Sequence, residues 1–600
     1  MAKELLKREQ VKKEDTWAIE DLFATEEDFL AAVENLEKLT AEFSEFTEDY
    51  LAQGGQSLLA YYKKLEKAML LLDDTYAYAS RNGDVDTTNA HYQGLRGKMA
   101  GVYQKLLEKN APIETFVAKL EEDTLEKMYA EAPELKKYQV SIADTRRLRP
   151  HTLTPEMEEL LASAHEMAGG TQKAFELLND ADFEYPVIED ENGEHIKVST
   201  GRFVPMLESS DVRVRREAFQ SFYARYEKYK NTFAALYEGK AKANCFYAKA
   251  RKYNSALEAA VDANNVPKEV YFNLIEAVHD NIGYMHQYMA LRKKLLKVDE
   301  LHMYDVYAPI VAEMNAEIGY PQAQEEIKAA LKVLGDEYVG LLEEGFTKRW
   351  IDKYENEGKR SGAYSAGNYS HHPYVLMNYQ HNLDSEFTLV HEMGHALHSY
   401  YSAKNNNIFD SEYKIFVAEV ASTCNEALLM NYLLEHTEDK KKRAYLINYF
   451  LEQFRTTLYR QTMFAEFEML THKMVEEGKP LTAESLKKLY YDLNVQYYGT
   501  DMVVDEEIAI EWARIPHFYY NFYVYQYATS FAASMALSQM ILKNGQPAVE
   551  RYLKFLSGGC TKAPTELLKD AGVDITTKEP IHAALQIFGD LIREMEELMK

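Results

Sequence analysis

The chain has 600 residues, 46% of them hydrophobic, so it can bury more than a single hydrophobic core usually organises. Acidic residues outnumber basic ones by 96 to 68, which gives a net charge of -28. This excess argues against nucleic acid or an anionic membrane as a partner, because both require clustered Lys and Arg. We expect a globular protein of two or more lobes that binds neither.

Three scattered cysteines, Cys245, Cys424 and Cys560, are too few for a disulfide framework, and the N-terminal residues lack the apolar core of a secretory signal. Residues 515–542 contain no Asp, Glu, Lys or Arg, yet they include histidine, asparagine, glutamine and five tyrosines. Such polarity is typical of a helix buried within protein, not in lipid. We predict a cytoplasmic protein with no membrane span.

Helical periodicity dominates the chain. From Glu26 to about Gly170, apolar residues recur at three- and four-residue steps, with a polar turn predicted at 81–83. The same pattern resumes at about Asp211 and continues through most of the remainder. These features predict a mainly α-helical fold.

One segment, 183–204, interrupts this pattern. Two strand-like runs flank Glu191-Asn192-Gly193, which predicts a β-hairpin. We place a domain boundary just after it. This gives an N-terminal helical lobe at 1–198 and a second domain at 199–600.

A second interruption precedes a long helical segment. The small-residue stretch 362–370 leads into Tyr374–Tyr379, which has the pattern of a strand. Asp384 can then cap a helix that begins at Ser385. A strand directly before this helix is well placed to pair its free edge with a peptide backbone, although it also fits an ordinary strand of a small sheet.

Residues 391–395 read His-Glu-Met-Gly-His. On a helix, residues four apart share a face, about 6 Å apart along the axis, so His391 and His395 can direct ring nitrogens at one Zn²⁺. Glu392 lies beside the first of them, where a carboxylate can take a proton from an attacking water. The motif predicts a zinc hydrolase whose third ligand is unspecified.

A third protein ligand is needed to complete a catalytic zinc site. After a polar loop, a second helix predicted from about Ser411 offers Glu412, Glu419 and Glu426. They are seven residues apart and therefore lie on almost one face, so periodicity does not choose among them.

Other histidines fit the zinc site less well. The pattern with a third histidine six residues after the second fails, because position 401 is tyrosine. His398 lies two helical turns from the first motif histidine, so we interpret it as structural. His165 belongs to an incomplete copy of the motif, and the His371–His372 pair is interpreted as a possible substrate contact and not as a ligand.

Two segments, HEMGHALHS from residue 391 and FVAEVASTCNEALL from residue 416, resemble the oligoendopeptidase F branch of the thimet oligopeptidase family of zinc peptidases. The resemblance covers most of the chain and extends to 147–153, 250–257 and 516–525. It implies that Glu419, in an E-V-x-S segment, is the third ligand. It also implies two lobes around a deep channel that admits short unfolded peptides and excludes folded proteins.

The same resemblance implies that a histidine and a tyrosine near residues 517–527 stabilise the oxyanion. His517 matches the histidine, and Tyr525 is the favoured tyrosine, with Tyr523 and Tyr527 as alternatives. Without the resemblance, these tyrosines fit the aromatic core of a buried helix.

These inferences together predict a mainly α-helical, two-lobed zinc endopeptidase with a small mixed β-sheet beside the zinc helix. The alternatives are a dipeptidyl carboxypeptidase with the same zinc site and a peptide-binding module without turnover, which an intact general base disfavours. One Zn²⁺ per chain and short peptide substrates are expected. The assigned residues are His391, His395 and Glu419 as metal ligands, Glu392 as general base, and His517 and Tyr525 as oxyanion donors.

Overall fold

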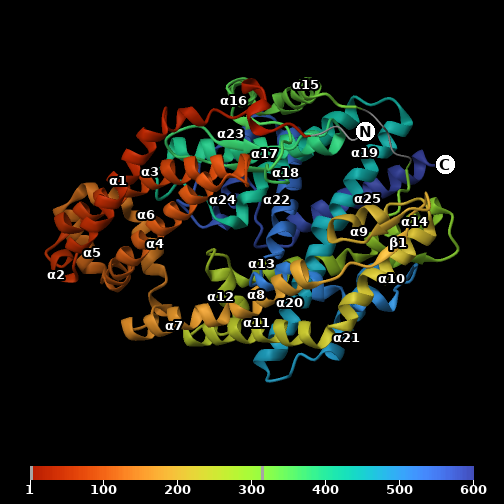
Figure 1. Cartoon of the computed structure of the whole chain (residues 1–600), viewed down its shortest axis with the longest axis horizontal. Helices are drawn as coiled ribbons and strands as arrows, with labels where there is room; N and C mark the ends of the chain where they lie inside the picture. Colours follow the sequence, from red (N-terminus) through yellow and green to blue (C-terminus); the bar gives the residue numbers. More distant parts are fainter. Residues whose placement is uncertain (1–4, 312–316) are drawn as a thin grey trace. The chain divides into compact units, whose positions relative to one another are not determined.

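The computed structural model describes residues 5–311 and 317–600, which are mainly helical with small sheets, as predicted (Figure 1). They form two compact units, each assembled from separate stretches of chain. Unit 1 comprises Met1–Thr152, Asn315–Tyr432 and Leu537–Val573, and unit 2 comprises Leu153–Met314, Leu433–Ala536 and Asp574–Lys600. The division into an N-terminal lobe at 1–198 and a second domain at 199–600 stays a prediction.

Each unit contains a set of helices joined by short loops and 3-10 turns. Those of unit 1 are α1 (Glu26–Glu42), α2 (Glu48–Leu51), α3 (Gly55–Val85), α4 (Ala90–Lys119), α5 (Glu122–Glu131), α6 (Gln139–Arg147), α15 (Tyr320–Ala330), α16 (Asp336–Thr347), α17 (Leu383–Asn405), α18 (Ile415–Glu435), α23 (Gln546–Leu556) and α24 (Pro564–Ala571). Those of unit 2 are α7 (Pro155–Ala168), α8 (Gly170–Glu176), α9 (Thr200–Leu207), α10 (Val212–Lys228), α11 (Lys230–Ala250), α12 (Ala256–Asp262), α13 (Lys268–Asp280), α14 (Ile282–Leu296), α19 (Lys440–Gln453), α20 (Arg460–Glu476), α21 (Ala483–Tyr498) and α25 (Glu579–Leu598). Two helices continue past a unit boundary, α18 and α22 (Tyr525–Asn544).

The polar turn predicted at 81–83 is wrong, because α3 runs through it. Asn82 is buried, and its side-chain amide donates to the carbonyl of Tyr78. A Cβ on Gly83 would lie 2.6 Å from Cδ of Arg96, so the glycine makes room for a side chain of α4. Packing between α3 and α4 therefore explains why residues typical of a turn lie within a helix.

The hairpin predicted around Glu191-Asn192-Gly193 is confirmed. Strands β1 (Val187–Glu189) and β2 (His195–Lys197) pair antiparallel. Gly193 has φ of 84°, and the carboxylate of Asp190 accepts from the backbone N–H groups of Asn192 and Glu194. A further pair in unit 2, β3 (Leu301–His302) and β7 (Met502–Val503), is parallel.

Unit 1 contains the mixed sheet that the sequence predicted beside the zinc helix. Its strand order is β4 (Ile351–Asp352), β6 (Tyr374–Leu376), β5 (Tyr364–Ala366), with β6 parallel to β4 and antiparallel to β5. Both β5 and β6 contact α17. Tyr374 and Leu376 also belong to the hydrophobic core built by the N-terminal helices, so that core supports the sheet.

A buried ion pair links β4 to the residue that follows β6. Lys359 and Asp352 have fully buried side chains, and the ammonium lies 2.7 Å from the carboxylate. The same ammonium donates to the carbonyl of Met377, just beyond β6. Arg8 adds a second contact to Asp352 at 2.5 Å, so the N-terminal segment is tied to the sheet. Burial of charges in this way is tolerated only because each has several partners.

Residues 515–542 are not one continuous helix. A short 3-10 turn, Pro516–Tyr519, precedes an irregular stretch, and α22 begins only at Tyr525. No helix of the described chain is long and apolar enough to span a bilayer. The three cysteines carry free thiols.

Candidate metal centre

Helix α17 carries the His-Glu-Met-Gly-His motif and begins earlier than predicted, at Leu383. Its N-cap is Asn382, whose side-chain oxygen accepts from the backbone N–H of Ser385 at 2.9 Å. The predicted cap, Asp384, is therefore wrong, because it already lies in the first turn. Ser385 supports the same entry by accepting from the backbone N–H of Gln380.

The second helix, α18, begins at Ile415 instead of near Ser411. Glu412 is consequently outside the helix and exposed. Glu419 and Glu426 both remain on α18, two turns apart, as the seven-residue spacing predicted. The start of the helix thus removes one of the three candidate carboxylates.

Three donor atoms converge between these helices. The Nε2 atoms of His391 and His395 lie 3.1 Å apart, and Oε2 of Glu419 lies 3.3 Å from the first and 3.4 Å from the second. Among the described residues, this is the group of three side chains close enough together to hold a metal ion.

The spacing fits zinc. In a tetrahedral site with bonds of about 2.0–2.1 Å, donor atoms lie about 3.3–3.4 Å apart. The three observed separations of 3.1, 3.3 and 3.4 Å match one face of such a tetrahedron. Two imidazoles and a carboxylate also form a donor set typical of catalytic zinc, with a fourth position left for water or substrate.

Glu426 has a different part in the site from the one its spacing suggested. Its carboxylate contacts Nδ1 of His391, the ring nitrogen that does not face the other donors. A carboxylate in this position fixes the tautomer and orientation of the imidazole and raises its basicity. The sequence pattern indicates Glu426 only as a candidate ligand. Its place two turns after Glu419, on the same helix face, is the feature that could have indicated a supporting role.

Glu419 is also held by its own helix. Ser422, one turn further on, donates from its hydroxyl to Oε2 of Glu419 at 3.1 Å. Because Oε2 is the donor atom of the triangle, this bond orients the carboxylate toward the histidines. Ser422 is fully buried, so the bond is shielded from water.

The pKa values of Glu419 and His391 are shifted in the directions expected for a site that favours positive charge. Burial alone opposes charge, but hydrogen bonds with His391 and His395 hold the pKa of Glu419 below its usual range. Burial also opposes a charge on His391, yet the contacts with Glu419 and Glu426 raise its pKa well above the ordinary value. A metal ion would bind to the same nitrogen and oxygen atoms that share protons in the metal-free site, so metal and protons compete for them.

Glu392 lies beside the donor triangle and is only 7% exposed. Burial raises the pKa of its carboxyl, while the neighbouring histidines and the backbone N–H of Ser365 in β5 oppose the shift. Its Oε2 atom has no hydrogen-bond partner among the described residues. A carboxylate in this state is suited to accept and return a proton.

Gly394 permits the close approach of the two helices. A Cβ at this position would lie 2.6 Å from Cα of Ser422 and 2.8 Å from the carbonyl oxygen of Ala421. Both obstacles are backbone atoms of α18, which cannot rotate away. The glycine of the motif is thus required by packing, and Glu419 reaches the histidines because of it.

The predicted pairing of a peptide with β6 is wrong. Strand β6 is the middle strand, and β4 and β5 already pair with its two edges. Strand β5 is at the edge of the sheet, and it is the strand whose Ser365 faces Glu392. The strand available next to the site is therefore β5.

The other histidines lie outside the group of three donor residues, and the substrate contact interpreted for His371 and His372 stays a prediction. His398 is buried and stacks on Tyr413 at 3.7 Å, and burial lowers its pKa to about 3. His372 stacks on Trp350 and contacts the carboxylate of Asp21. His165 is exposed on α7.

The expected oxyanion residues belong to unit 2. His517 is half-buried, with its ring 6.1 Å from the rings of both Tyr523 and Tyr527. Tyr525 is 1% exposed and its ring packs against Tyr271 at 5.0 Å. The assignment of His517 and Tyr525 stays a prediction, and the two alternative tyrosines are the ones beside the histidine.

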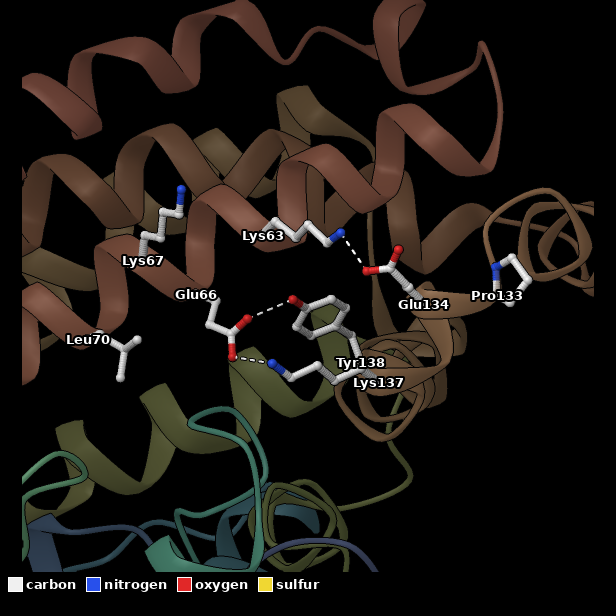
Figure 2. Close-up of a pocket in the computed structure, with 8 residues that line it drawn as sticks. All are labelled: Lys63, Glu66, Lys67, Leu70, Pro133, Glu134, Lys137 and Tyr138. Carbon is white, nitrogen blue, oxygen red and sulfur yellow. Dashed lines mark hydrogen bonds and ion pairs between the residues drawn. The ribbon is translucent and has the colours of Figure 1, made fainter.

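Figure 2 shows a separate cleft of about 590 Å³ in unit 1, between α3 and the 3-10 segment Pro133–Tyr138. Its carboxylates are already paired, Glu66 with Lys137 and Glu134 with Lys63, each at 2.6 Å. The residues that line it include neither histidine nor cysteine. It therefore does not compete with the donor triangle as a zinc site.

Gly394→Ala should destabilise unit 1 by about 1–3 kcal/mol, the usual cost of overpacking, and weaken zinc binding because α18 must move. Urea denaturation and zinc competition with a chromogenic chelator would measure the two effects. Gly340→Ala is the matched control, because its Cβ would meet no atom within 4 Å on helix α16. Equal behaviour of the two variants would show that the helix contact is not a constraint.

Glu419→Ala and Glu426→Gln should separate a ligand from its support. We expect Glu426→Gln to weaken zinc binding by about 10–100-fold and Glu419→Ala to weaken it much further. Glu412→Ala, on an exposed residue outside the helix, should bind zinc normally. Tight zinc binding by Glu419→Ala would assign the third ligand to another carboxylate.

Comparison with known proteins gives a consistent assignment. A model of Peptidase family M3 matches residues 205–587, more than half of the chain, and a model described as Oligopeptidase F matches residues 117–185. Oligopeptidase PepF of Bacillus subtilis is 46% identical over 100% of this chain and 89% of its own length. Group B oligopeptidase PepB of Streptococcus agalactiae is 38% identical over 99% of this chain and 98% of its own.

Solved structures agree. A Chlamydophila abortus protein assigned as a peptidase superposes with a TM-score of 0.91 at 35% identity, covering 99% of this chain and all of that one. Oligoendopeptidase-F from Enterococcus faecium gives a TM-score of 0.75 at 36% identity, covering 97% and 99%. With the zinc-type donor triangle and the adjacent glutamate, these full-length matches show that the chain belongs to peptidase family M3, the family of thimet oligopeptidase and oligoendopeptidase F.

Proposed function

We propose that this protein is a zinc-dependent endopeptidase that hydrolyses short, unfolded peptides, with one zinc ion per chain. The observation that carries the proposal is the tetrahedral spacing of His391, His395 and Glu419 beside a buried carboxyl, Glu392. The names of the relatives, which describe oligopeptidases, support the size of the substrate. The free thiols support the cytoplasmic location expected from the sequence.

The chain's own residues divide the chemistry among them. Bound zinc would lower the pKa of a coordinated water to about 7 and polarise the scissile carbonyl. Glu392 accepts the proton of the attacking water and later delivers it to the departing amine. Glu392 has an oxygen without a hydrogen-bond partner among the described residues, so this atom is free to take and return the proton. Glu426 keeps His391 in the tautomer that presents Nε2 to the metal.

Strand β5 is the proposed docking edge for the substrate backbone. An extended peptide that pairs with an exposed strand gains main-chain hydrogen bonds and presents alternate side chains to pockets. Strand β5 contacts α17, and its Ser365 N–H faces Glu392, so a peptide on this edge lies near the general base. Recognition through the backbone would allow many sequences to bind.

The oxyanion is proposed to receive hydrogen bonds from His517 and from a tyrosine of the segment 523–527. Burial lowers the pKa of His517, so it would act as a neutral donor. Tyr523 and Tyr527 lie beside His517, whereas Tyr525, favoured from the sequence, packs on Tyr271. Proximity to the histidine supports the first two.

Glu392→Gln should retain zinc and lose about 10²–10⁴-fold in kcat, because the amide cannot take a proton. Metal analysis and hydrolysis of an internally quenched peptide blocked at both ends would measure this. A chelator should abolish cleavage by the wild type, and added zinc should restore it.

The same blocked peptide separates the proposal from its rival. A dipeptidyl carboxypeptidase requires a free substrate carboxylate and would leave this peptide intact while removing dipeptides from an unblocked one. Near-normal turnover by Glu392→Gln would reject the general-base assignment, whichever substrate is used.

Replacing each tyrosine by phenylalanine should identify the oxyanion donor. Loss of one such donor typically costs about 10²–10³ in kcat. We expect this loss for Tyr523→Phe or Tyr527→Phe, and a small change for Tyr525→Phe. Single-turnover rates at saturating peptide would measure it, and a loss confined to Tyr525→Phe would return the assignment to the residue favoured from the sequence.

A further inference from the structure

The segment that joins His517 to α22 contains an unusual reversal. Asn521 and Phe522 have φ of 56° and 57°, so two consecutive residues with side chains occupy the left-handed region. Such a conformation is unfavourable for a bulky residue like phenylalanine and persists only where surrounding contacts enforce it. Phe522 is 2% exposed, so those contacts come from the protein interior.

The contact that fixes this reversal is a hydrogen bond from the backbone N–H of Phe522 to Oε1 of Glu468, at 2.7 Å. Glu468 lies on α20 and is fully buried. The N–H group is buried as well, so without this carboxyl it would lose its acceptor in an apolar surrounding. The left-handed conformation of the two residues and the acceptor oxygen of Glu468 thus depend on each other.

Burying the carboxyl group of Glu468 costs free energy, which indicates that this residue has a specific role. Its second oxygen has no hydrogen-bond partner among the described residues, and burial raises its pKa to about 8. The opposing influences are the Phe522 N–H and the charge of Lys240 on α11. The other titratable neighbours, Tyr237, Tyr271 and His472, provide no strong counter-charge, since burial raises the pKa of both phenols and lowers that of the imidazole to about 4.

The aromatic residues at and after the reversal pack in two places. The ring of Phe522 packs on His472 at 4.5 Å and on Tyr271 at 5.9 Å, and Tyr525 packs on the same Tyr271. Tyr523 and Tyr527 instead lie together, 5.4 Å apart, beside His517. Phe522 and Tyr525 thus pack in the interior, whereas Tyr523 and Tyr527 lie beside the histidine.

We propose that Glu468 is a positioning residue, whose carboxyl oxygen holds the 521–522 reversal and thereby presents the Tyr523–Tyr527 segment beside His517. This inference rests on the proposed function only where it assigns these aromatic residues to the oxyanion. The hydrogen bond needs an acceptor oxygen at this position and does not need a negative charge.

Glu468→Met and Glu468→Gln test this directly, since both preserve side-chain length and only the amide retains an acceptor oxygen. In Glu468→Met, kcat should fall about 10–100-fold, as for a misplaced catalytic group, with KM within about twofold and zinc content unchanged. Hydrogen–deuterium exchange of the Phe522 amide should accelerate at least about tenfold. Glu468→Gln should restore slow exchange and bring kcat within about threefold of the wild type.

Glu466→Met is the matched control, because Glu466 lies on the same helix and contacts His279 and Tyr497, each at 2.8 Å, instead of the reversal. It should leave exchange at Phe522 unchanged. If Glu468→Met does not fold, Glu468→Asp replaces it, since its carboxyl is withdrawn from Phe522 by one methylene. Wild-type kcat and wild-type exchange at Phe522 in Glu468→Met, or in Glu468→Asp where it replaces that variant, would overturn the proposal. A Glu468→Gln protein as impaired as Glu468→Met would also overturn it.

The exchange measurement separates the two levels of inference. If the wild type does not cleave a blocked peptide, the proposed function fails, and slow exchange that depends on the acceptor oxygen still supports the structural part. If the wild type cleaves and Glu468→Met does so equally well, only the positioning role of Glu468 fails.

Discussion

The contact between α17 and α18 at Gly394 is the constraint on which the metal centre depends. Two of the three donor residues come from one helix and the third from the other, so the separation and register of the helices set the donor triangle. A site of this kind tolerates errors of about 0.5 Å. Any Cβ at Gly394 would lie 2.6 Å from Cα of Ser422, closer than an ordinary van der Waals contact. The helices would have to move apart to relieve this contact, and that movement would be at least as large as the tolerance of the site.

The carboxylates near that contact surround the donor triangle with negative charge, which favours the binding of a cation there. Glu392, Glu419 and Glu426 lie around His391, and although burial opposes a charge on this histidine, its contacts with Glu419 and Glu426 raise its pKa well above the ordinary value. Several carboxylates in a partly buried space repel one another unless positive charge is shared among them. The surrounding sheet contributes by placing Ser365 against Glu392, and the buried Lys359–Asp352 pair fastens that sheet.

Local patterns predicted what depends on neighbouring residues in the chain. The spacing of His391 and His395 places both on one helix face wherever that helix packs, and the turn chemistry at Asn192-Gly193 produces a hairpin without distant help. Predictions failed where a distant segment decides the outcome. Arg96 of α4 explains the helical Gly83, and pairing with β4 and β5 removed the free edge from β6. The start of α18 likewise excluded Glu412.

The sequence by itself determined the helical class, the histidine pair, the glutamate beside it and a choice of three carboxylates, because each follows from periodicity and residue chemistry along a few turns. Resemblance to a family then selected Glu419. Only the tertiary structure decided that Glu419 completes the triangle while Glu426 supports His391, that β5 is the edge strand, and that Glu468 holds the reversal at Phe522. These depend on atoms brought together from segments tens to hundreds of residues apart, and no local pattern encodes such distances.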